Sequence, residues 1–401
     1  MQTRHYPPTD NFLEMLLKAN AARLGAVFQH PNEYRLQVVY TRIDRDQQNK
    51  PHFQDFYYRV DTNSYFYPAS TVKLPGAILA LEKLNDLHIP GVDKFTPMLT
   101  DSLANISPAV TSDSSAVNKL PSIAHYIKKI FLTSDNDAFN RLYEFLGQQE
   151  FNTRLWEKGY TQAQIRHRVG IPLNIVDNLQ TNAIRFQQGH HLLYLQPAKI
   201  SHLNFSPRHD SIGKAHYNYL GKLQNGPMDF SFRNRISLPA LHNIMRSIIF
   251  PEAVTNSQRF RLTESDYQFL YKCMSQLPSE TADPAYDTSQ FQDAYVKFLL
   301  YGGEKTAHIP PHIRIFNKPG WAYGFLTDVA YIVDFANQVE FLLSATVYVN
   351  KDGILGDDQY EFDQTGKPFL KVLGQLIYET ELQRKKKYPA DLSRYKIIYD
   401  K

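Results

Sequence analysis

The chain has 401 residues, 43% of them hydrophobic, so it can bury a sizeable core in one large domain or two to three ordinary ones. Its 44 basic and 40 acidic residues leave a net charge of +4, too small to indicate a nucleic-acid or anionic-membrane partner. No apolar run is long enough for a transmembrane helix, and residues 1–8 lack an apolar segment, so we expect no signal peptide in this chain. The only cysteine, Cys273, excludes an intrachain disulfide and lies in an apolar-periodic stretch that predicts a buried, inert thiol.

Helix and strand patterns alternate near both ends of the chain. Apolar residues at helical spacing predict a helix over residues 11–24, and alternating residues predict strands over 33–43 and 53–60. Further helices are predicted from Ser70 onward and over residues 122–132, 135–146, 238–249 and 264–277. Strands over 313–318, 323–335 and 341–349 then precede a final amphipathic helix over 368–384.

These elements predict an α/β (α+β) fold in a single domain over residues 11–390. The two N-terminal and three C-terminal strands form a five-stranded antiparallel sheet with the terminal helices packed on it. This α/β lobe takes residues 11–64 and 312–390. Residues 65–311 form an all-helical lobe between its two halves.

Three short motifs, far apart in sequence, carry nucleophile chemistry. They are Ser70-Thr71-Val72-Lys73, Ser134-Asp135-Asn136 and Lys318-Pro319-Gly320. Ser70 and Lys73 share one face of a helix, so Lys73 can remove the proton of the serine hydroxyl if burial and nearby cations lower its pKa. A serine at a helix N-terminus also leaves its N–H free for an oxyanion hole. Taken singly, each motif also has an ordinary structural interpretation. The first is a capped helix with a solvated lysine, the second is a helix cap, and the third is a turn.

Together with the segment Phe66-Tyr67-Pro68-Ala69 before Ser70, the motifs resemble class A β-lactamases and penicillin-binding proteins, which are active-site serine hydrolases. The resemblance covers about residues 11–388 and implies the serine β-lactamase/DD-peptidase-like fold. It implies a serine hydrolase that works through an acyl-enzyme on Ser70, with Lys73 as its base.

The resemblance also implies roles for the other motif residues. Ser134 would pass a proton to the leaving nitrogen, and Asn136 would hydrogen-bond the substrate amide and Lys73. Lys318 would bind a substrate carboxylate and lower the pKa values of Ser134 and Lys73. The N–H groups of Ser70 and Trp321 would form the oxyanion hole. Gly320 would let the substrate approach the strand backbone, whereas Asp135 would be structural.

Two departures from the family pattern affect the expected substrate binding and deacylation. Pro319 replaces the threonine that helps to bind the substrate carboxylate, although an edge strand tolerates proline. Class A enzymes carry Glu-x-x-Leu-Asn in an Ω-loop, and the counterpart here is Gly170-Ile171-Pro172-Leu173-Asn174. Asn174 matches and would contact substrate, but Gly170 stands where the glutamate would activate the deacylating water. Glu157 and His167 are the neighbouring bases, and a structural role is expected for each.

Compared with a compact class A enzyme, the chain has insertions near residues 185–235 and 280–312. The first is rich in histidine and aromatic residues, but the histidine spacings match no metal-ligand template, so no metal site is expected. We expect this insertion to cover one side of the active-site cleft and narrow the choice of substrate.

The leading hypothesis is therefore a β-lactamase-like serine hydrolase with slow or non-standard deacylation. Its substrate would be a small molecule or peptide with an amide or lactam bond, and no cofactor is implied. Two alternatives stay open: a penicillin-binding or D-Ala-D-Ala peptidase-like enzyme, and a non-catalytic binding protein on a degenerate β-lactamase fold. The resemblance places the protein in the periplasm or outside the cytoplasmic membrane of bacteria.

Overall fold

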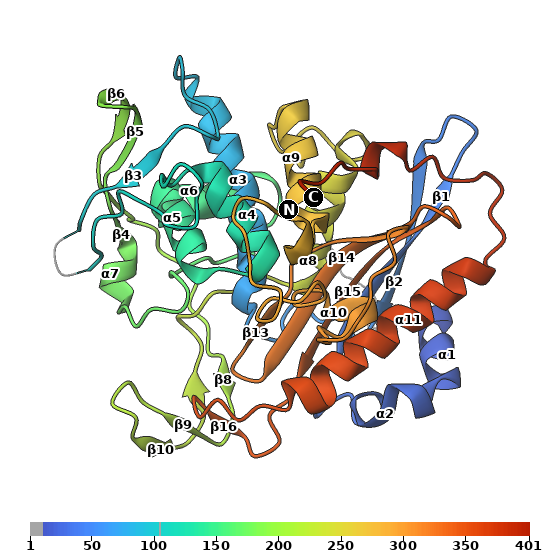
Figure 1. Ribbon diagram of the computed structural model, residues 1–401. Coiled ribbons are helices and arrows are strands. Elements are labelled where there is room, and N and C mark those ends of the chain that lie inside the picture. The colour runs from blue at the N-terminus through green and yellow to red at the C-terminus, as the bar shows by residue number, and fades with distance from the viewer. Residues whose placement is uncertain (1–10, 104–105) are drawn as a thin grey trace.

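A computed structural model describes residues 11–103 and 106–401 (Figure 1). One part of the molecule is an antiparallel sheet with helices on both faces, and the other is a helix-rich lobe beside it. The N-terminal and C-terminal segments meet in the same sheet, because β1 (Gln37–Arg45) pairs with β15 (Val339–Tyr348). The chain therefore leaves the sheet after β2 (Pro51–Tyr58), builds the lobe, and returns.

The main sheet has the strand order β12-β14-β15-β1-β2, with every pairing antiparallel. β12 is Ile313–Asn317 and β14 is Phe325–Asp334. A sixth strand, β13 (Gly320–Ala322), pairs with β14 beyond the end of β12. The predicted five-stranded antiparallel sheet is confirmed, with its edge strand divided into two pieces.

Pro319 lies at the division of that edge strand, between β12 and β13. Proline has no N–H to donate to a ladder and is tolerated at a sheet edge, as the sequence analysis expected. After β13 the chain reverses at Tyr323 and Gly324, whose φ angles of 53° and 77° are typical of a tight hairpin turn. The strand predicted over residues 323–335 therefore starts at Phe325.

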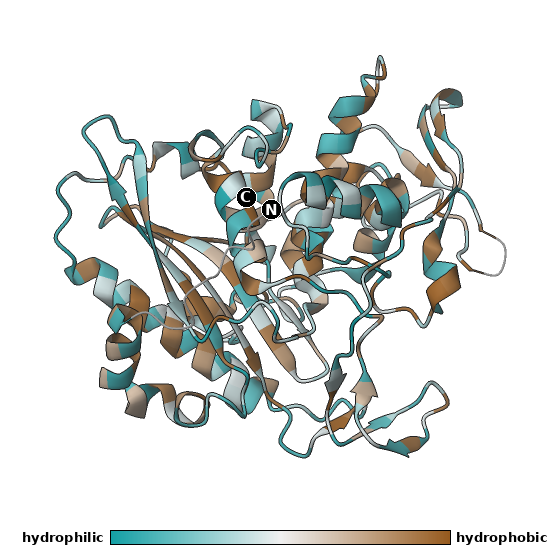
Figure 2. Ribbon diagram, turned by 180° about the vertical axis from the view of Figure 1, so that it is seen from behind, coloured by the Kyte–Doolittle hydropathy of each residue, from teal (hydrophilic) through white to brown (hydrophobic). Residues whose placement is uncertain are grey.

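The two faces of the sheet bury two different cores. Along β1, Val38 and Tyr40 face the core under α1 (Asn11–Ala19), α2 (Ala21–Gln29) and α11 (Lys367–Gln383). Val39 and Ile43 face the core shared with α8 (Leu238–Ile249) and the lobe. Figure 2 shows this arrangement as hydrophobic strands between helices with hydrophilic outer turns.

The helical lobe contains the predicted helices and one helix, over residues 148–157, that the sequence did not predict. α3 (Lys73–Leu87), α4 (Ile123–Thr133), α5 (Asn136–Leu146), α6 (Gln148–Glu157) and α9 (Glu264–Ser275) form its body. α8 has the bounds predicted for it, and Ser237 caps its N-terminus by accepting from the Ala240 N–H. The helix predicted over residues 11–24 is instead broken at Asn20, and a backbone kink at Gly25, with φ 62°, interrupts α2.

The lobe also contains short strands, so it is not all-helical as expected. β3 (Met98–Thr100), β5 (Ile184–Gln188) and β6 (His191–Gln196) form a small antiparallel sheet. The remaining short elements are α7 (Ile175–Leu179), β4 (Gln180–Thr181), β7 (Lys199–Ile200), β8 (Ser211–Ile212), β9 (Ala215–Tyr217), β10 (Leu223–Asn225), β11 (Met228–Asp229), α10 (Phe298–Tyr301) and β16 (Ile354–Leu355). Among the described residues, no helix is both long and apolar enough to cross a membrane.

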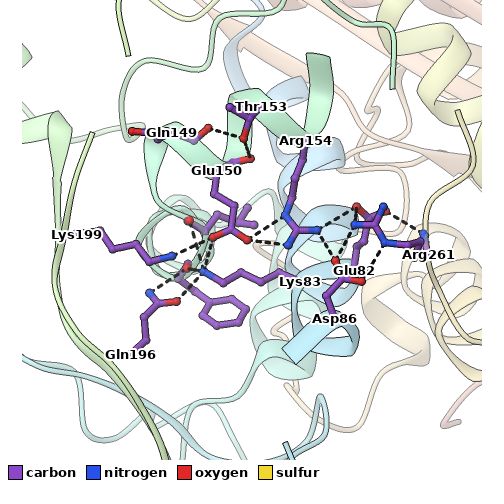
Figure 3. Close-up of polar contacts among 12 residues, drawn as sticks. Glu82, Lys83, Asp86, Gln149, Glu150, Thr153, Arg154, Gln196, Lys199 and Arg261 are labelled. Atoms are coloured by element: carbon purple, nitrogen blue, oxygen red, sulfur yellow. Dashed lines mark hydrogen bonds and ion pairs between the residues drawn. The ribbon is translucent and has the colours of Figure 1, made fainter. Parts of the chain in front are cut away.

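Arg154 joins α6 to the second half of α3 through a network of ion pairs (Figure 3). Its guanidinium contacts the carboxylates of Glu150, Asp86 and Glu82 at 2.7, 2.6 and 3.2 Å. Lys83 pairs with the same Glu150 at 3.0 Å and is buried, which lowers its pKa. Arg261, Lys158 and Lys199 complete the network. The helix that begins at Lys73 is thereby anchored at its far end.

We expect Arg154→Ala to lower the free energy of unfolding by about 2–3 kcal/mol, because it leaves buried carboxylates short of a cation. The matched control is Arg23→Ala, which breaks the ion pair with Glu379, where both side chains are over 40% exposed. That exposed pair should contribute less than about 1 kcal/mol. Urea denaturation measures both variants, and equal losses would contradict a stabilising role for the buried network.

Candidate active site

Ser70 lies in a short 3-10 helix, Ala69–Val72, which leads directly into α3. The residue before it, Ala69, has a φ of 45°, a left-handed conformation that costs about 1 kcal/mol in a non-glycine residue. Strand β13 packs against this turn at Gly320, where an added Cβ would lie 2.7 Å from the backbone nitrogens of Ser70 and Thr71. Only glycine fits there, and this close approach brings the backbones of Ser70 and Trp321 together.

The second motif follows from the way α4 ends and α5 begins. Ser134 ends α4 in the left-handed region, with a φ of 59°. Asp135 then caps α5 by accepting from the Ala138 N–H, which matches the structural role expected for it. The tight junction turns the Ser134 side chain toward the lysines of the other two motifs.

A buried network connects the three motifs. The Lys73 ammonium donates to Asn136 Oδ1 at 2.6 Å, to the Ser134 carbonyl oxygen, and to Ser134 Oγ at 3.4 Å. The Lys318 ammonium donates to Ser134 Oγ at 2.9 Å and to the Pro319 carbonyl oxygen at 2.7 Å. Ser134 therefore lies between two lysines, with Ser70 one helical turn from Lys73. In the part of the chain that the structure describes, no hydrogen bond joins the side chains of Ser70 and Lys73.

Burial weakens the proton affinity of both lysines. It lowers the pKa of Lys73 to about 7, against the opposing effect of the Asp135 carboxylate. For Lys318, burial and then the neighbouring Lys73 ammonium lower the pKa well below its ordinary value. A lysine with a pKa near 7 is a proton acceptor at neutral pH, which is the property that the sequence analysis required of Lys73.

We expect the rate of acylation to rise between pH 5 and pH 9 with a midpoint near 7, because Lys73 accepts a proton only in its neutral form. Stopped-flow measurement of acylation by a chromogenic lactam gives this profile. His167 does not account for it, because burial lowers the pKa of His167 to about 4. His216→Asn serves as a control and should keep the midpoint. A profile that is flat or falls through pH 7 would contradict the role of Lys73.

A cleft of about 970 Å³ opens over the nucleophile, lined by Ser70, Asn136 and Trp321 among others. Lys73, Ser134 and Lys318 lie beneath its surface, with exposed fractions of 0, 8 and 1%. Lys318 donates to Ser134 from this buried position, and its contact with a substrate carboxylate stays a prediction. The first insertion forms one wall of the cleft with residues 216–219 and 228–229, as the sequence analysis expected.

The second insertion contributes a row of aromatic rings at the other end of the site. The Thr133 hydroxyl donates to the Tyr286 hydroxyl at 3.2 Å, and Tyr286 contacts Phe291 with ring centroids 5.2 Å apart. The row continues through Tyr295 to Trp321, at 5.1 and 6.2 Å. The row therefore connects Thr133, which precedes Ser134, with Trp321, which follows Gly320. The sequence does not predict this row, because its contacts join distant parts of the chain.

Gly170 packs directly on Asn136. A Cβ on Gly170 would lie 2.5 Å from Asn136 Nδ2, and its φ of 69° disfavours any other residue. The adjoining His167 also lines the cleft, but both ring nitrogens are engaged, one by the Arg168 carbonyl oxygen and the other by the Asn234 N–H at 3.1 Å. Glu157 ends α6 and does not line the cleft. Neither His167 nor Glu157 therefore offers a free base in place of the glutamate that Gly170 replaces.

Asn174 does not line the cleft and takes no part in the buried network beneath it. Its side chain caps α7 by accepting from the Asp177 N–H at 2.8 Å, and it lines a neighbouring pocket. A capping role alone explains an asparagine at this position, and its contact with substrate stays a prediction.

We expect Gly170→Glu to slow acylation about tenfold without accelerating deacylation, because the new side chain must displace Asn136 from Lys73. Gly170→Ala is the matched variant, because it adds the Cβ without the carboxylate and should slow acylation similarly. The lifetime of the acyl adduct, followed by mass spectrometry, is the second measurement. A tenfold or greater gain in turnover for Gly170→Glu would contradict this prediction.

The cleft is also lined by four charged residues that the motifs do not predict, Arg168, Asp229, Arg233 and Asp358. Arg233 and Asp229 lie in the wall formed by the first insertion.

Residues 11–103 and 106–401 hold no group of three or more His, Cys, Asp or Glu side chains that could bind a metal ion. Cys273 is buried as predicted, and burial raises the pKa of its thiol to about 12.

The fold and the site together define a serine hydrolase class, and a family comparison identifies it. The model of the beta-lactamase enzyme family matches residues 21–264, more than half of the chain, and the chain belongs to this family. The matched region includes the Ser70 and Ser134 motifs and ends before Lys318. Family membership supports an enzyme of the β-lactamase-like serine hydrolase type.

Solved structures similar to this chain include three β-lactamases. That from Streptomyces albus G is 11% identical, with a TM-score of 0.49 over 90% of this chain and 98% of its own. That from Xanthomonas campestris is 14% identical, with a TM-score of 0.48 over 90% and 98%. That from Sphaerobacter thermophilus is 12% identical, with a TM-score of 0.47 over 92% and 99%. A comparison with curated protein sequences found no match.

Proposed function

We propose that the protein opens an amide or lactam carbonyl by forming an acyl-enzyme on Ser70. Lys73 takes the proton of the Ser70 hydroxyl as the oxygen attacks the carbonyl carbon. Ser134 passes a proton to the leaving nitrogen, and the N–H groups of Ser70 and Trp321 hold the oxyanion. The observation that carries this proposal is the buried network in which both lysines converge on Ser134, next to the nucleophile.

Each step of acylation has a side chain with suitable proton affinity. Lys73, with a pKa near 7, is neutral in a large fraction of molecules at neutral pH. Lys318 directs its ammonium to Ser134 Oγ, which favours a hydroxyl that donates its proton to a departing amine. Asn136 lines the cleft while holding Lys73, so its amide nitrogen can contact a substrate carbonyl.

Deacylation is proposed to be slow. A class A-like mechanism needs a base that activates water beside the ester carbonyl, and Gly170 has no side chain for this task. His167 cannot readily substitute, because its ring nitrogens are engaged and burial lowers its pKa to about 4. The acyl-enzyme should therefore persist for longer than one catalytic cycle of an efficient lactamase.

A penicillin-binding or D-Ala-D-Ala peptidase-like enzyme is the second candidate. Such an enzyme shares the three motifs and needs no glutamate in the loop, so Gly170 favours it. A cleft of about 970 Å³ also has room for a peptide substrate. On either candidate we propose that the protein works outside the cytoplasmic membrane, where peptide substrates of this class are found.

A time course with benzylpenicillin and with a peptide ending in D-Ala-D-Ala tests the proposal. A penicilloyl adduct that forms within minutes and persists for hours, with little hydrolysed product, would support slow deacylation. Release of D-Ala from the peptide would favour the peptidase-like candidate. Rapid penicillin turnover without an adduct would overturn slow deacylation. Neither adduct nor product with either compound would indicate a non-catalytic binding protein, or a hydrolase of another acyl group.

A further inference from the structure

A second pocket of about 500 Å³, here called the distal pocket, adjoins the active-site cleft. The two share His167, Asp229 and Arg233 as lining residues. Residues 167–172 line the cleft and residues 173–175 line the distal pocket, so one stretch of chain forms a wall of both. Asn136, against which Gly170 packs, stands at the cleft end of this wall.

Arg166 lines the distal pocket with its charge unpaired. Its guanidinium donates to a neutral partner, the Gln164 side-chain oxygen, at 3.1 and 2.8 Å. It lies over the Phe205 ring at 4.3 Å and 5.9 Å from the centre of the Phe232 ring. Among the described residues it forms no ion pair with a carboxylate, and burial lowers its pKa.

Arg233 is the second unpaired cation, at the junction of cleft and distal pocket. Its guanidinium lies 5.9 Å from the centre of the Tyr323 ring, and no ion pair to it occurs within residues 11–103 and 106–401. Two other arginines of the same insertion, Arg208 and Arg235, both pair with Asp210 at 3.2 Å. In contrast to Arg233, these two arginines share one carboxylate from their own insertion.

One carboxylate, Asp229, lines both cavities and opposes the two arginines. Its Oδ1 accepts from the Ser231 N–H at 2.8 Å, and in the described chain it forms an ion pair with neither Arg166 nor Arg233. Two guanidinium groups against one carboxylate leave an excess of positive charge beside aromatic rings. Such a site favours a ligand with a negative end.

We propose that the distal pocket binds an anionic group, a carboxylate or phosphate, at the end of the substrate's acyl side chain, held by Arg166 and Arg233. This inference rests on the proposed function, because it assumes an acyl group attached at Ser70 and directed past Asn136. The chain wall from Gly170 to Asn174 then guides the side chain toward the arginines.

Binding to the Ser70→Ala variant tests the distal pocket without any acylation. The probes are three cephalosporins with 7-acyl side chains of similar length: glutaryl, its methyl ester, and a phosphonate analogue. By isothermal titration calorimetry we expect the glutaryl or the phosphonate compound, or both, to bind at least about tenfold more tightly than the ester. The stronger of the two anions identifies the ligand group. Equal affinity for all three, or no binding of any, would overturn the proposal.

Arginine variants in the same Ser70→Ala background locate the effect. Arg166→Gln and Arg233→Gln should each weaken binding of the preferred anion about tenfold and change binding of the ester less than twofold. Arg166→Lys keeps the positive charge and controls for a folding defect. It should lose less affinity for the anion than Arg166→Gln loses. Lys222 is an exposed residue of the same insertion outside both pockets, so Lys222→Gln should change the affinity for neither ligand. Equal losses for anion and ester would contradict an anion site.

Failure of the proposed function gives a different result. If wild-type protein forms no adduct while Ser70→Ala still prefers the anionic probe, the acyl-enzyme proposal fails and the distal pocket stands. If wild type is acylated but Ser70→Ala binds the ester as tightly as the anions, only the distal pocket fails.

Discussion

Replacement of Lys73 by methionine is expected to slow acylation of Ser70 by about 10³-fold, within the range for removal of a general base. Methionine roughly preserves the volume of the buried side chain, so the loss should reflect chemistry rather than a cavity. The pH dependence with a midpoint near 7 should disappear in the same variant. Rapid-mixing mass spectrometry with benzylpenicillin measures the rate of adduct formation directly.

A matched control for Lys73 exists elsewhere in the same protein. Lys83 is also buried, and burial lowers its pKa to about 7, but it donates to Gln196 Oε1 at 2.6 Å and pairs with Glu150 at the far end of α3. Lys83→Met should therefore leave acylation within about threefold of wild type. Similar rates for wild type and Lys73→Met would contradict the assignment of Lys73 as the base.

Replacement of Gly320 by alanine is expected to slow acylation about 100-fold and to lower the free energy of unfolding by about 1–3 kcal/mol. The added Cβ would lie 2.7 Å from the Ser70 and Thr71 nitrogens and 2.8 Å from the Pro68 carbonyl oxygen. These are backbone atoms of the turn that positions the nucleophile, so they cannot move without moving Ser70. Acylation rate and urea denaturation measure the two effects.

Gly366→Ala is the control for Gly320→Ala, because its added Cβ would also meet an atom at 2.7 Å. That atom belongs to the flexible Leu326 side chain, on the opposite core from the nucleophile. This variant should lose some stability but keep its acylation rate. An unchanged acylation rate in Gly320→Ala would contradict the close packing of β13 on the Ser70 turn.

Local sequence signals predicted the parts of the site that depend on local chemistry. The Ser70 and Lys73 spacing, the cap at Asp135 and the helix start at Ser237 each depend on residues within one turn of helix. Runs of apolar residues likewise predicted the sheet, because β1, β14 and β15 bury side chains in both cores. Such signals survive folding because tertiary contacts reinforce them.

Contacts between distant segments could not be read from the sequence. The burial of Lys318 depends on packing from other parts of the chain, and the row from Tyr286 to Trp321 joins two segments by ring contacts alone. The pairing of Asp210 with Arg208 and Arg235, which leaves Arg233 unpaired, is equally a matter of tertiary structure. Asn174 shows the converse: a residue that matches a motif serves as a helix cap.

The central claim is that Ser70 is a nucleophile that becomes acylated. Intact-mass spectrometry of wild type and Ser70→Ala after incubation with benzylpenicillin, followed by peptide mapping, tests it most directly. The account predicts a wild-type mass increase of one penicillin molecule, located on the peptide that contains Ser70, and no increase in Ser70→Ala. An adduct on another residue, or the same adduct in both proteins, would contradict it.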